Sequence, residues 1–344
     1  QATDLKKRLW FTLGALIVFR FLSFVPLPGI DPTALAAWSQ KSAGGILDIF
    51  NTFSGGALSR ASLITLGIMP YITASIVVQL AASLSPQLAA IKKEGESGRK
   101  KLNQYTRYGT VGLTAVQGYA AAANWQAQGV VVDPGMLFVV SAIISLIGGT
   151  MFLLWLGEQI TARGIGNGTS LIIFTGIVAE IPAALAQFFS MGRSNVISTP
   201  VIIGVLVMVV VVIAAVVFME RALRKISIQY PRRQVGMKIY DGGSSHLPIK
   251  VNPAGVIPAI FASSLLLLPI TISTFSGAQT GPIMSTILAY FGPGQPLYLL
   301  FFVGMIVFFA YFYTHNVAFK VDEVAQNLQN QNGFIPGIRP GKKT

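Results

Sequence analysis

The sequence offers few residues that could carry out enzymatic chemistry. It has no cysteine and only two histidines, His246 and His315. A disulfide or a thiolate metal site is therefore impossible, and a histidine-rich metal site is not expected. His315 has no serine or carboxylate at helical spacing that would complete a hydrolase site. We therefore predict a protein that needs no metal or cofactor and is not an enzyme.

The glycine-rich run GIGNG, from Gly164 to Gly168, is the one motif that could suggest a nucleotide. No strand precedes it, and its spacing is not that of a dinucleotide-binding fingerprint. Thr169 and Ser170 follow the run and favour the N-terminal cap of a helix. We therefore predict a tight turn and a helix cap here rather than a phosphate site.

The composition indicates an integral membrane protein. Hydrophobic residues make up 53% of the 344 residues and charged residues only 11%, whereas a soluble domain carries about 25% charged residues. The sequence begins with Gln1 rather than methionine, so we expect that its N-terminus has been trimmed. Eight apolar runs are candidates for membrane-spanning helices, for which about 20 apolar residues are needed. They are Leu9–Val25, Ser62–Leu84, Tyr108–Trp125, Met136–Leu156, Thr169–Phe189, Pro200–Met219, Pro253–Phe275 and Leu297–Phe319.

These runs differ in character. The sixth is rich in valine and isoleucine and has no charge, which is typical of a helix that faces lipid. The third is rich in small residues, so we expect it to pack closely against other helices. Gly67 and Pro70 interrupt the second run, and Pro258 and Pro269 interrupt the seventh. We expect these two helices to be irregular.

Basic residues predict the orientation of the spans. All but four of the 25 Lys and Arg residues lie before the first run or in the alternate connections that this assignment places on the cytoplasmic side. The four exceptions are Arg20, Lys41, Arg60 and Arg193. Both ends of the sequence are therefore expected in the cytoplasm, and attraction to anionic lipid accounts for part of the net charge of +13.

The stretch Phe50–Leu80 enters the membrane region irregularly. The preceding apolar piece, Ile46–Phe53, is too short to cross a bilayer, and Gly55 and Gly56 follow it. Broken backbone at membrane depth is tolerated only inside protein or beside a water-filled cavity, so this stretch suggests a pore. An interfacial helix that leads into an ordinary span is the alternative.

Two isolated charges suggest a transporter as an alternative function. Arg20 and Glu180 lie in apolar runs, and charges inside a membrane are often kept for ion coupling. Both are placed near the outer ends of their runs, where long side chains can reach the interface. They do not form a convincing relay, but Glu180 keeps a secondary transporter as the alternative hypothesis.

Pairs of isoleucines recur at helical spacing in the irregular spans. Ile68 and Ile72 share a face of the second span, and the pair Ile173 and Ile177 repeats this spacing in the fifth. Ile257 and Ile260 stand three residues apart in the seventh. Such pairs could line a pore, or they could face lipid or a neighbouring helix.

Two segments on the cytoplasmic side are larger than topology requires. Residues 220–252 contain β-branched and aromatic residues around Gly242 and Gly243, which suggests a projecting hairpin-like loop. Residues 320–344 form a basic tail. Projecting basic segments are suited to docking a ribonucleoprotein or an acidic partner.

Several long motifs resemble those of the SecY family, the channel subunits of the bacterial Sec translocon. They are FNTFSGGALSRAS, LGIMPYITASI, IKKEGESGRKKLNQYTRYG, GEQITARGIGNGTSLIIFTGIVA, HLPIKVNPAGVIPAIFASS and FIPGIRPG. The resemblance extends over nearly the whole sequence. It implies an all-α polytopic membrane protein: an inverted-repeat bundle of two halves, residues 1–190 with spans 1 to 5 and residues 191–344 with spans 6 to 8.

The resemblance also implies the functional residues. It places a short re-entrant plug helix at about residues 46–59, with the plug region comprising Phe53, Gly55, Gly56 and Arg60. An apolar pore ring would consist of Ile68, Ile72, Ile173, Ile177 and Ile260. Gln79 and Ile257 would line a lateral gate between spans 2 and 3 and spans 7 and 8. The contact residues for the ribosome or the SecA motor ATPase would be Lys225, Arg232, Arg233, Lys238 and Arg339.

The sequence departs from the family pattern in two places. Related sequences often carry two arginines just before the Val-Tyr or Ile-Tyr of the large loop, where this sequence has Met237 and Lys238, so only the charge of Lys238 remains. The family has ten spans and this sequence accounts for eight of them, so we expect spans 9 and 10, with one further ring residue, outside it.

The resemblance implies a channel for unfolded secretory and membrane proteins in the bacterial inner membrane. The expected partners are the small SecE and SecG subunits, SecA, the ribosome and anionic lipid. No ATP site is visible in the sequence, so partners are expected to supply the driving energy.

Overall fold

The computed structural model describes residues 2–41, 51, 56–240, 242–255, 257–265, 296–315 and 320–344. The chain divides into two compact units, Gln1–Phe188 with Phe261–Phe302, and Phe189–Ile260 with Val303–Thr344. Phe53, Gly55 and most of the predicted plug helix lie outside the described residues, as do Pro269 and the second half of the seventh predicted span.

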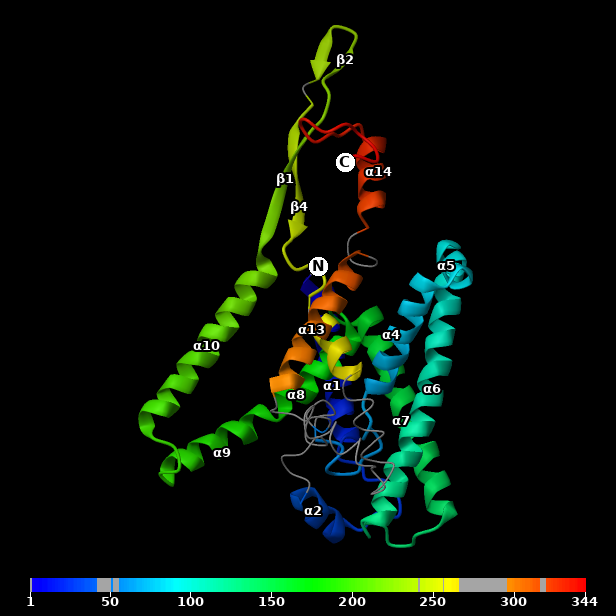
Figure 1. Cartoon of the computed structure of the whole chain (residues 1–344), viewed down its shortest axis with the longest axis vertical. Helices are drawn as coiled ribbons and strands as arrows, with labels where there is room; N and C mark the ends of the chain where they lie inside the picture. The colour runs from blue at the N-terminus through cyan, green and yellow to red at the C-terminus, as the bar shows by residue number, and fades with distance from the viewer. Residues whose placement is uncertain are drawn as a thin grey trace. The chain divides into compact units, whose positions relative to one another are not determined.

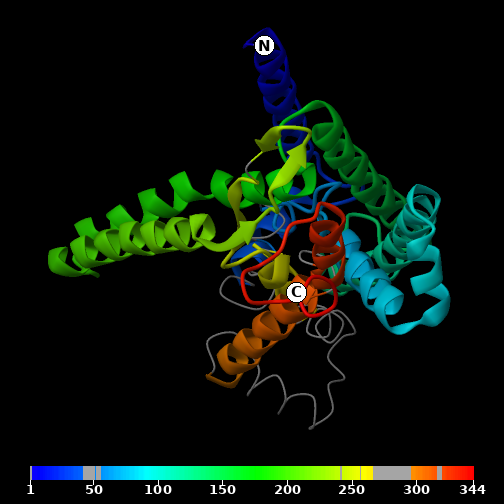
Figure 2. The same cartoon turned by 90° about the horizontal axis from the view of Figure 1, so that it is seen from above.

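The first unit is a helical bundle arranged around one long antiparallel pair, α6 and α7. Helix α4 packs on α6, and both α1 and α8 pack on α7. The pair α6 and α7 lies side by side in both views (Figure 1 and Figure 2). The helices of this unit are α1 (Ala2–Leu22), α2 (Pro32–Lys41), α4 (Met69–Leu84), α5 (Pro86–Lys93), α6 (Glu96–Ala127), α7 (Met136–Arg163), α8 (Gly168–Ala179) and the first part of α9 (Ile181–Arg193).

Helix α6 is much longer than the predicted third span, with 32 residues, because a polar first part precedes the apolar one. Its buried face carries Thr106, Thr110 and Thr114. Each of these hydroxyls donates to the carbonyl four residues earlier, at 2.6–2.9 Å, so the buried stripe satisfies its own donors. Gly118 allows close contact with Leu146 of α7. The prediction that this span packs against other helices is confirmed.

The second span begins later than predicted. Residues 56–68, which include the predicted start at Ser62, lie mainly in turns, and α4 begins at Met69. Pro70 occupies the first turn of α4, where its missing N–H costs no hydrogen bond, so it starts the helix rather than interrupting it. Gly67 has a φ of +59°, which favours glycine and separates the turns from the helix.

Residues 56–68 are deeply buried although they are not helical. Ala57, Ala61 and Ile64 have no exposed surface, and Leu66 is 1% exposed. Protein therefore surrounds this non-helical backbone. Inside a bilayer such backbone is tolerated only where protein or a water-filled cavity surrounds it. The expectation that this stretch is irregular is confirmed.

Four helical segments of the described residues are long and apolar enough to cross a membrane. They are α7, the pair α8 and α9, α10 and α13. Helices α4 and α5 pass the same test together but bend by 98° at Ser85, directly before Pro86. The predicted fifth span is thus a pair of helices with a break at Glu180.

The second unit combines α10 (Thr199–Arg221), α13 (Pro296–Tyr313) and α14 (Val321–Asn330), together with a β-ribbon. None of the residues of α10 is buried, which agrees with the prediction of a lipid-facing helix. Helix α13 begins in the first unit and continues into the second. Residues 257–265 are helical and account for the described part of the seventh predicted span.

The β-ribbon forms the loop after α10. Strands β1 (Leu223–Gln229) and β4 (Ser244–Lys250) pair antiparallel, and β2 (Arg233–Val235) pairs with β3 (Lys238–Tyr240) beyond them (Figure 1). The predicted hairpin-like loop is therefore confirmed.

The turn of the ribbon is not at Gly242 and Gly243, around which the hairpin was expected. It is formed by Gly236 and Met237, because Gly236 has the positive φ, +65°, that the first position of a two-residue turn requires. Gly242 instead lies against the carbonyl groups of Tyr230 and Pro231, where a side chain would not fit.

Candidate functional site

The isoleucines predicted to line a pore lie in both units. Ile68 precedes α4 and Ile72 lies in its first turn, with the Ile72 N–H donating to the Ile68 carbonyl at 3.1 Å. This turn places both side chains on one face, and each is 4% exposed. Ile173 and Ile177 lie one turn apart on α8, half-buried and exposed respectively. Ile260 belongs to the second unit, so the ring as a whole stays a prediction.

The residues predicted for the lateral gate differ in their surroundings. Gln79 of α4 is half-buried, and its Nε2 lies 3.5 Å from Ser75 Oγ. Its buried Oε1 has no hydrogen-bond partner among the described residues. Ile257 is half-buried at the start of the helical stretch 257–265. The gate assignment of both residues stays a prediction.

The loop Gly164–Gly168 is a structural junction. The Asn167 side chain accepts hydrogen bonds from the N–H groups of Thr169 at 3.1 Å and Ser170 at 3.4 Å, so it caps α8. The predicted cap function of Thr169 and Ser170 is therefore wrong, since they donate to the cap. Asn167 is preferred because its short amide reaches the free N–H groups of the first turn.

This loop is also attached to α1. Arg8 donates to the Gly164 carbonyl at 3.2 Å, and the Ile165 N–H donates to Thr12 Oγ1 at 3.2 Å. Gly168 lies so close to the carbonyl of Gly157 on α7 that a Cβ would overlap it. The backbone N–H groups that a bound phosphate would need already donate to Asn167 and Thr12. This agrees with the prediction of a tight turn rather than a phosphate site.

A charged cluster lies beside the end of the predicted plug. Arg20 near the end of α1 pairs with Glu180 at the break between α8 and α9, with 3.4 Å between Nη2 and Oε1. The guanidinium of Arg60 lies 4.1 Å above the ring of Phe24, and that of Arg20 lies 5.0 Å from the same ring. Gly56 lies directly against the Glu180 carboxylate.

The sequence indicated only part of this cluster. Arg20 and Glu180 were recognised as isolated charges in apolar runs, and Gly56 and Arg60 as part of the plug region. Their pairing was missed because the two charges are 160 residues apart. Ser23 and Phe24, which hold Arg60, carry no signal in the sequence that distinguishes them from other residues of an apolar run.

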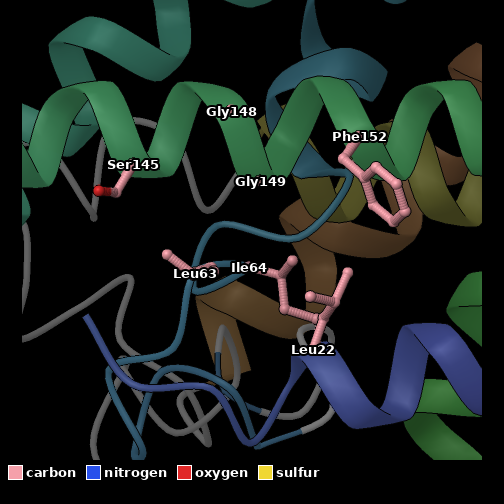
Figure 3. A pocket seen from close by; sticks show the side chains of 7 residues that line it. All are labelled: Leu22, Leu63, Ile64, Ser145, Gly148, Gly149 and Phe152. Atoms are coloured by element: carbon pink, nitrogen blue, oxygen red, sulfur yellow. The ribbon is translucent and has the colours of Figure 1, made fainter. Parts of the chain in front are cut away.

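An apolar cavity of about 340 Å³ lies next to the buried turns. Leu22, Leu63 and Ile64 face the part of α7 that contains Gly148 and Gly149, with Phe152 one turn further along (Figure 3). The two glycines leave α7 without side chains where it passes the turns. The helix therefore supports residues 62–64 through backbone contact.

The basic residues predicted to contact cytoplasmic partners lie on the ribbon and the tail of the second unit. Lys225 lies on β1, Arg232 and Lys238 lie near the ribbon tip, and Arg339 lies in the tail, and all four are exposed. Arg233 lies on β2. Met237 is completely exposed at the turn.

The tail is attached to the ribbon by a short β-bridge. Gln229 and Phe334 exchange two backbone hydrogen bonds, at 2.9 and 3.0 Å. Gly333 is buried against Tyr230 and Ile228, where an added Cβ would lie 3.0 and 3.2 Å from their side chains. The bridge therefore joins the basic residues of the ribbon and those of the tail in a single hydrogen-bonded structure.

The apolar helices and the buried non-helical backbone between them define a polytopic helical membrane protein. The family model of SecY matches residues 62–344. The protein translocase subunit SecY of Escherichia coli K12 is 52% identical over 346 residues, which covers 99% of this chain and 78% of the relative. The corresponding subunit of Rickettsia bellii is 47% identical, covering 100% of this chain and 80% of the relative. The chain belongs to the SecY family.

Solved structures of channels share the fold. A structure described as a protein-conducting channel superposes with a TM-score of 0.66 at 19% identity, over 98% of this chain and 79% of that one. Sec61 from a canine ribosome–channel complex gives a TM-score of 0.64 at 18% identity, over 97% and 77% of the two chains. The fold is therefore that of SecY and Sec61 channels.

Proposed function

We propose that this chain is the channel-forming subunit of a bacterial translocon. It passes unfolded secretory proteins across the membrane and releases transmembrane segments sideways into lipid. The observation that carries this proposal is the buried, non-helical backbone of residues 56–68 within a bundle of apolar helices. Such backbone requires surrounding protein or a water-filled cavity at membrane depth. Membership of the SecY family supports the same function.

The pore ring explains how the channel accepts many sequences. Isoleucine side chains offer no hydrogen bonds, so a collar of Ile68, Ile72, Ile173, Ile177 and Ile260 would fit around any passing side chain. When no chain is present, an apolar constriction excludes water and ions by dewetting. The shared face of Ile68 and Ile72 at the first turn of α4 supports their place in this collar.

The lateral gate lets a passing segment partition between channel and lipid. Gln79 on α4 and Ile257 on the helical stretch 257–265 would line it. A segment leaves through this gate when its transfer into hydrocarbon is favourable, so release follows its apolar character. This function needs no catalytic group, and we propose that the chain is not an enzyme.

The exposed basic ribbon and tail are the proposed docking site for the ribosome and for SecA. Lys225, Arg232, Arg233, Lys238 and Arg339 would contact phosphate or acidic groups there. The fold is shared with Sec61 from a ribosome–channel complex, which supports the ribosome as a partner. SecE, SecG and anionic lipid complete the proposed surroundings, in the bacterial inner membrane with both ends of the sequence cytoplasmic.

Cross-linking tests the pore assignment directly. A single cysteine at Ile72 in the full-length channel is combined with a secretory chain that carries a cross-linker and is stalled during export. We expect an efficient adduct at position 72. Val209 on α10, which is 49% exposed, serves as the lipid-facing control and should react little. Efficient adducts at position 209 with none at position 72 would overturn the assignment.

A further inference from the structure

One carboxylate joins three segments of the first unit that are distant in sequence. Glu180 ends α8, and its Oε1 lies 3.4 Å from Arg20 Nη2 on α1. A Cβ built on Gly56 would lie 2.9 Å from the same Oε1 and 3.0 Å from Arg60 Nη1. The carboxylate therefore lies against the backbone of residue 56 and beside the guanidinium of Arg60.

The two arginines of this cluster share one aromatic ring. The guanidinium carbons of Arg20 and Arg60 lie 5.0 and 4.1 Å from the centre of Phe24. The face of an aromatic ring attracts each cation, but the two positive charges repel each other at this short range. A negative group beside them offsets this repulsion, and Glu180 lies 3.4 Å from Arg20 and next to Gly56 and Arg60.

Arg60 is fixed to the residue that follows α1 by further hydrogen bonds. Its Nε donates to the Ser23 carbonyl at 3.0 Å, and its Nη2 lies 3.4 Å from Ser23 Oγ. Ser23 has no exposed surface. Gly56 has a φ of +83° and no side chain, which lets its backbone reach the carboxylate. Residues 56–60 are thus held at both ends, by Gly56 and by Arg60.

We propose that Glu180 is a positioning residue that tethers residues 56–60 to the end of α1 and to the break between α8 and α9. Neutralising its charge leaves Arg20 and Arg60 repelling each other over Phe24, which favours release of this segment. The inference rests on the proposed channel function, in which these residues adjoin the plug. The tether thereby stabilises the closed channel.

The test uses a buried reporter in the full-length channel in membranes. Ala57 has no exposed surface, and the sequence has no natural cysteine, so Ala57→Cys should be protected from a membrane-impermeant maleimide. We expect Glu180→Gln to increase the labelling rate several-fold and to raise the ion leak of resting vesicles.

Glu158→Gln is the matched control. Glu158 pairs with Arg107 between α6 and α7, and its side chain is 45% exposed, compared with 41% for Glu180. It should change neither labelling nor leak. Glu180→Asp keeps the negative charge and should retain most of the protection that Glu180→Gln removes.

The outcomes separate the tether from the channel function. Equal labelling and equal leak in Glu180→Gln and the parent would overturn the tether, as would equal effects of Glu180→Gln and Glu158→Gln. If the parent channel exports a secretory precursor normally in these experiments, the proposed function stands and only the tether is lost. Failure of export by the parent would instead contradict the proposed function.

Discussion

Gly149 of α7 lies directly against the carbonyl group of Leu63. A Cβ at position 149 would overlap this carbonyl, whereas the neighbouring Gly148 has no atom within 4 Å of its Cβ position. The contact holds the long helix α7 against the buried turns that precede α4. These turns form the non-helical part of the proposed pore, so the fit of one glycine helps to position them.

Gly149→Ala should destabilise the protein by about 1–3 kcal/mol, because backbone atoms on both sides must move apart to admit the methyl group. Gly148→Ala is the control on the same helix. It should be neutral or stabilising by up to about 1 kcal/mol, because alanine favours a helix. Thermal unfolding of the purified channel measures both. Equal stability of the two variants would contradict the contact.

Ile72→Ser should raise the ion conductance of vesicles that contain the resting channel. A hydroxyl at an apolar constriction favours water, which weakens the dewetted seal. Val209→Ser on the exposed surface of α10 should leave conductance unchanged. Because Ile72 is 4% exposed, thermal unfolding is measured in parallel to show that the variant is folded. Unchanged conductance in a folded variant would count against a sealing function for Ile72.

A disulfide should form between cysteines at Gln229 and Phe334. These residues exchange two backbone hydrogen bonds, and the Cα atoms of such a pair are about 5.5 Å apart, within the range that a disulfide allows. A mild oxidant and non-reducing electrophoresis after proteolysis between the two positions detect the bond. Cysteines at Ser227 and Phe334 are the control, because Ser227 lies two residues further along β1. Equal cross-linking of both pairs would argue against a fixed register between ribbon and tail.

Asn167→Ala should destabilise the protein by about 1 kcal/mol, since two N–H groups at the start of α8 lose their acceptor. Asn167→Asp keeps an acceptor oxygen and should retain most of the stability. Thermal unfolding compares the three proteins. The loss of stability should be confined to Asn167→Ala. An equal loss in Asn167→Asp would contradict the cap, because it would mean that the amide stabilises the protein by some other contact.

Much of the fold follows from local sequence patterns. The charge-free run of valine and isoleucine predicted a span over Pro200–Met219, and the structure has α10 at Thr199–Arg221. The β-branched and aromatic residues after it likewise predicted a hairpin-like loop. In both cases the signal lies within the segment itself, because hydrophobicity and backbone preference act over short stretches of chain.

Other features were decided only by tertiary contacts. Continuous apolar character predicted helix from Ser62, but residues 56–68 form turns, because their backbone groups bond within the turns and to Val25 and Leu27 in place of a helix. The proximity of Arg20 and Glu180 depends on the packing of α1 against α8. The sequence by itself determined that this is a polytopic membrane protein with an irregular second span. The tertiary structure alone decided which charges meet beside that span, because an ion pair between residues far apart in the chain leaves no periodic pattern in it.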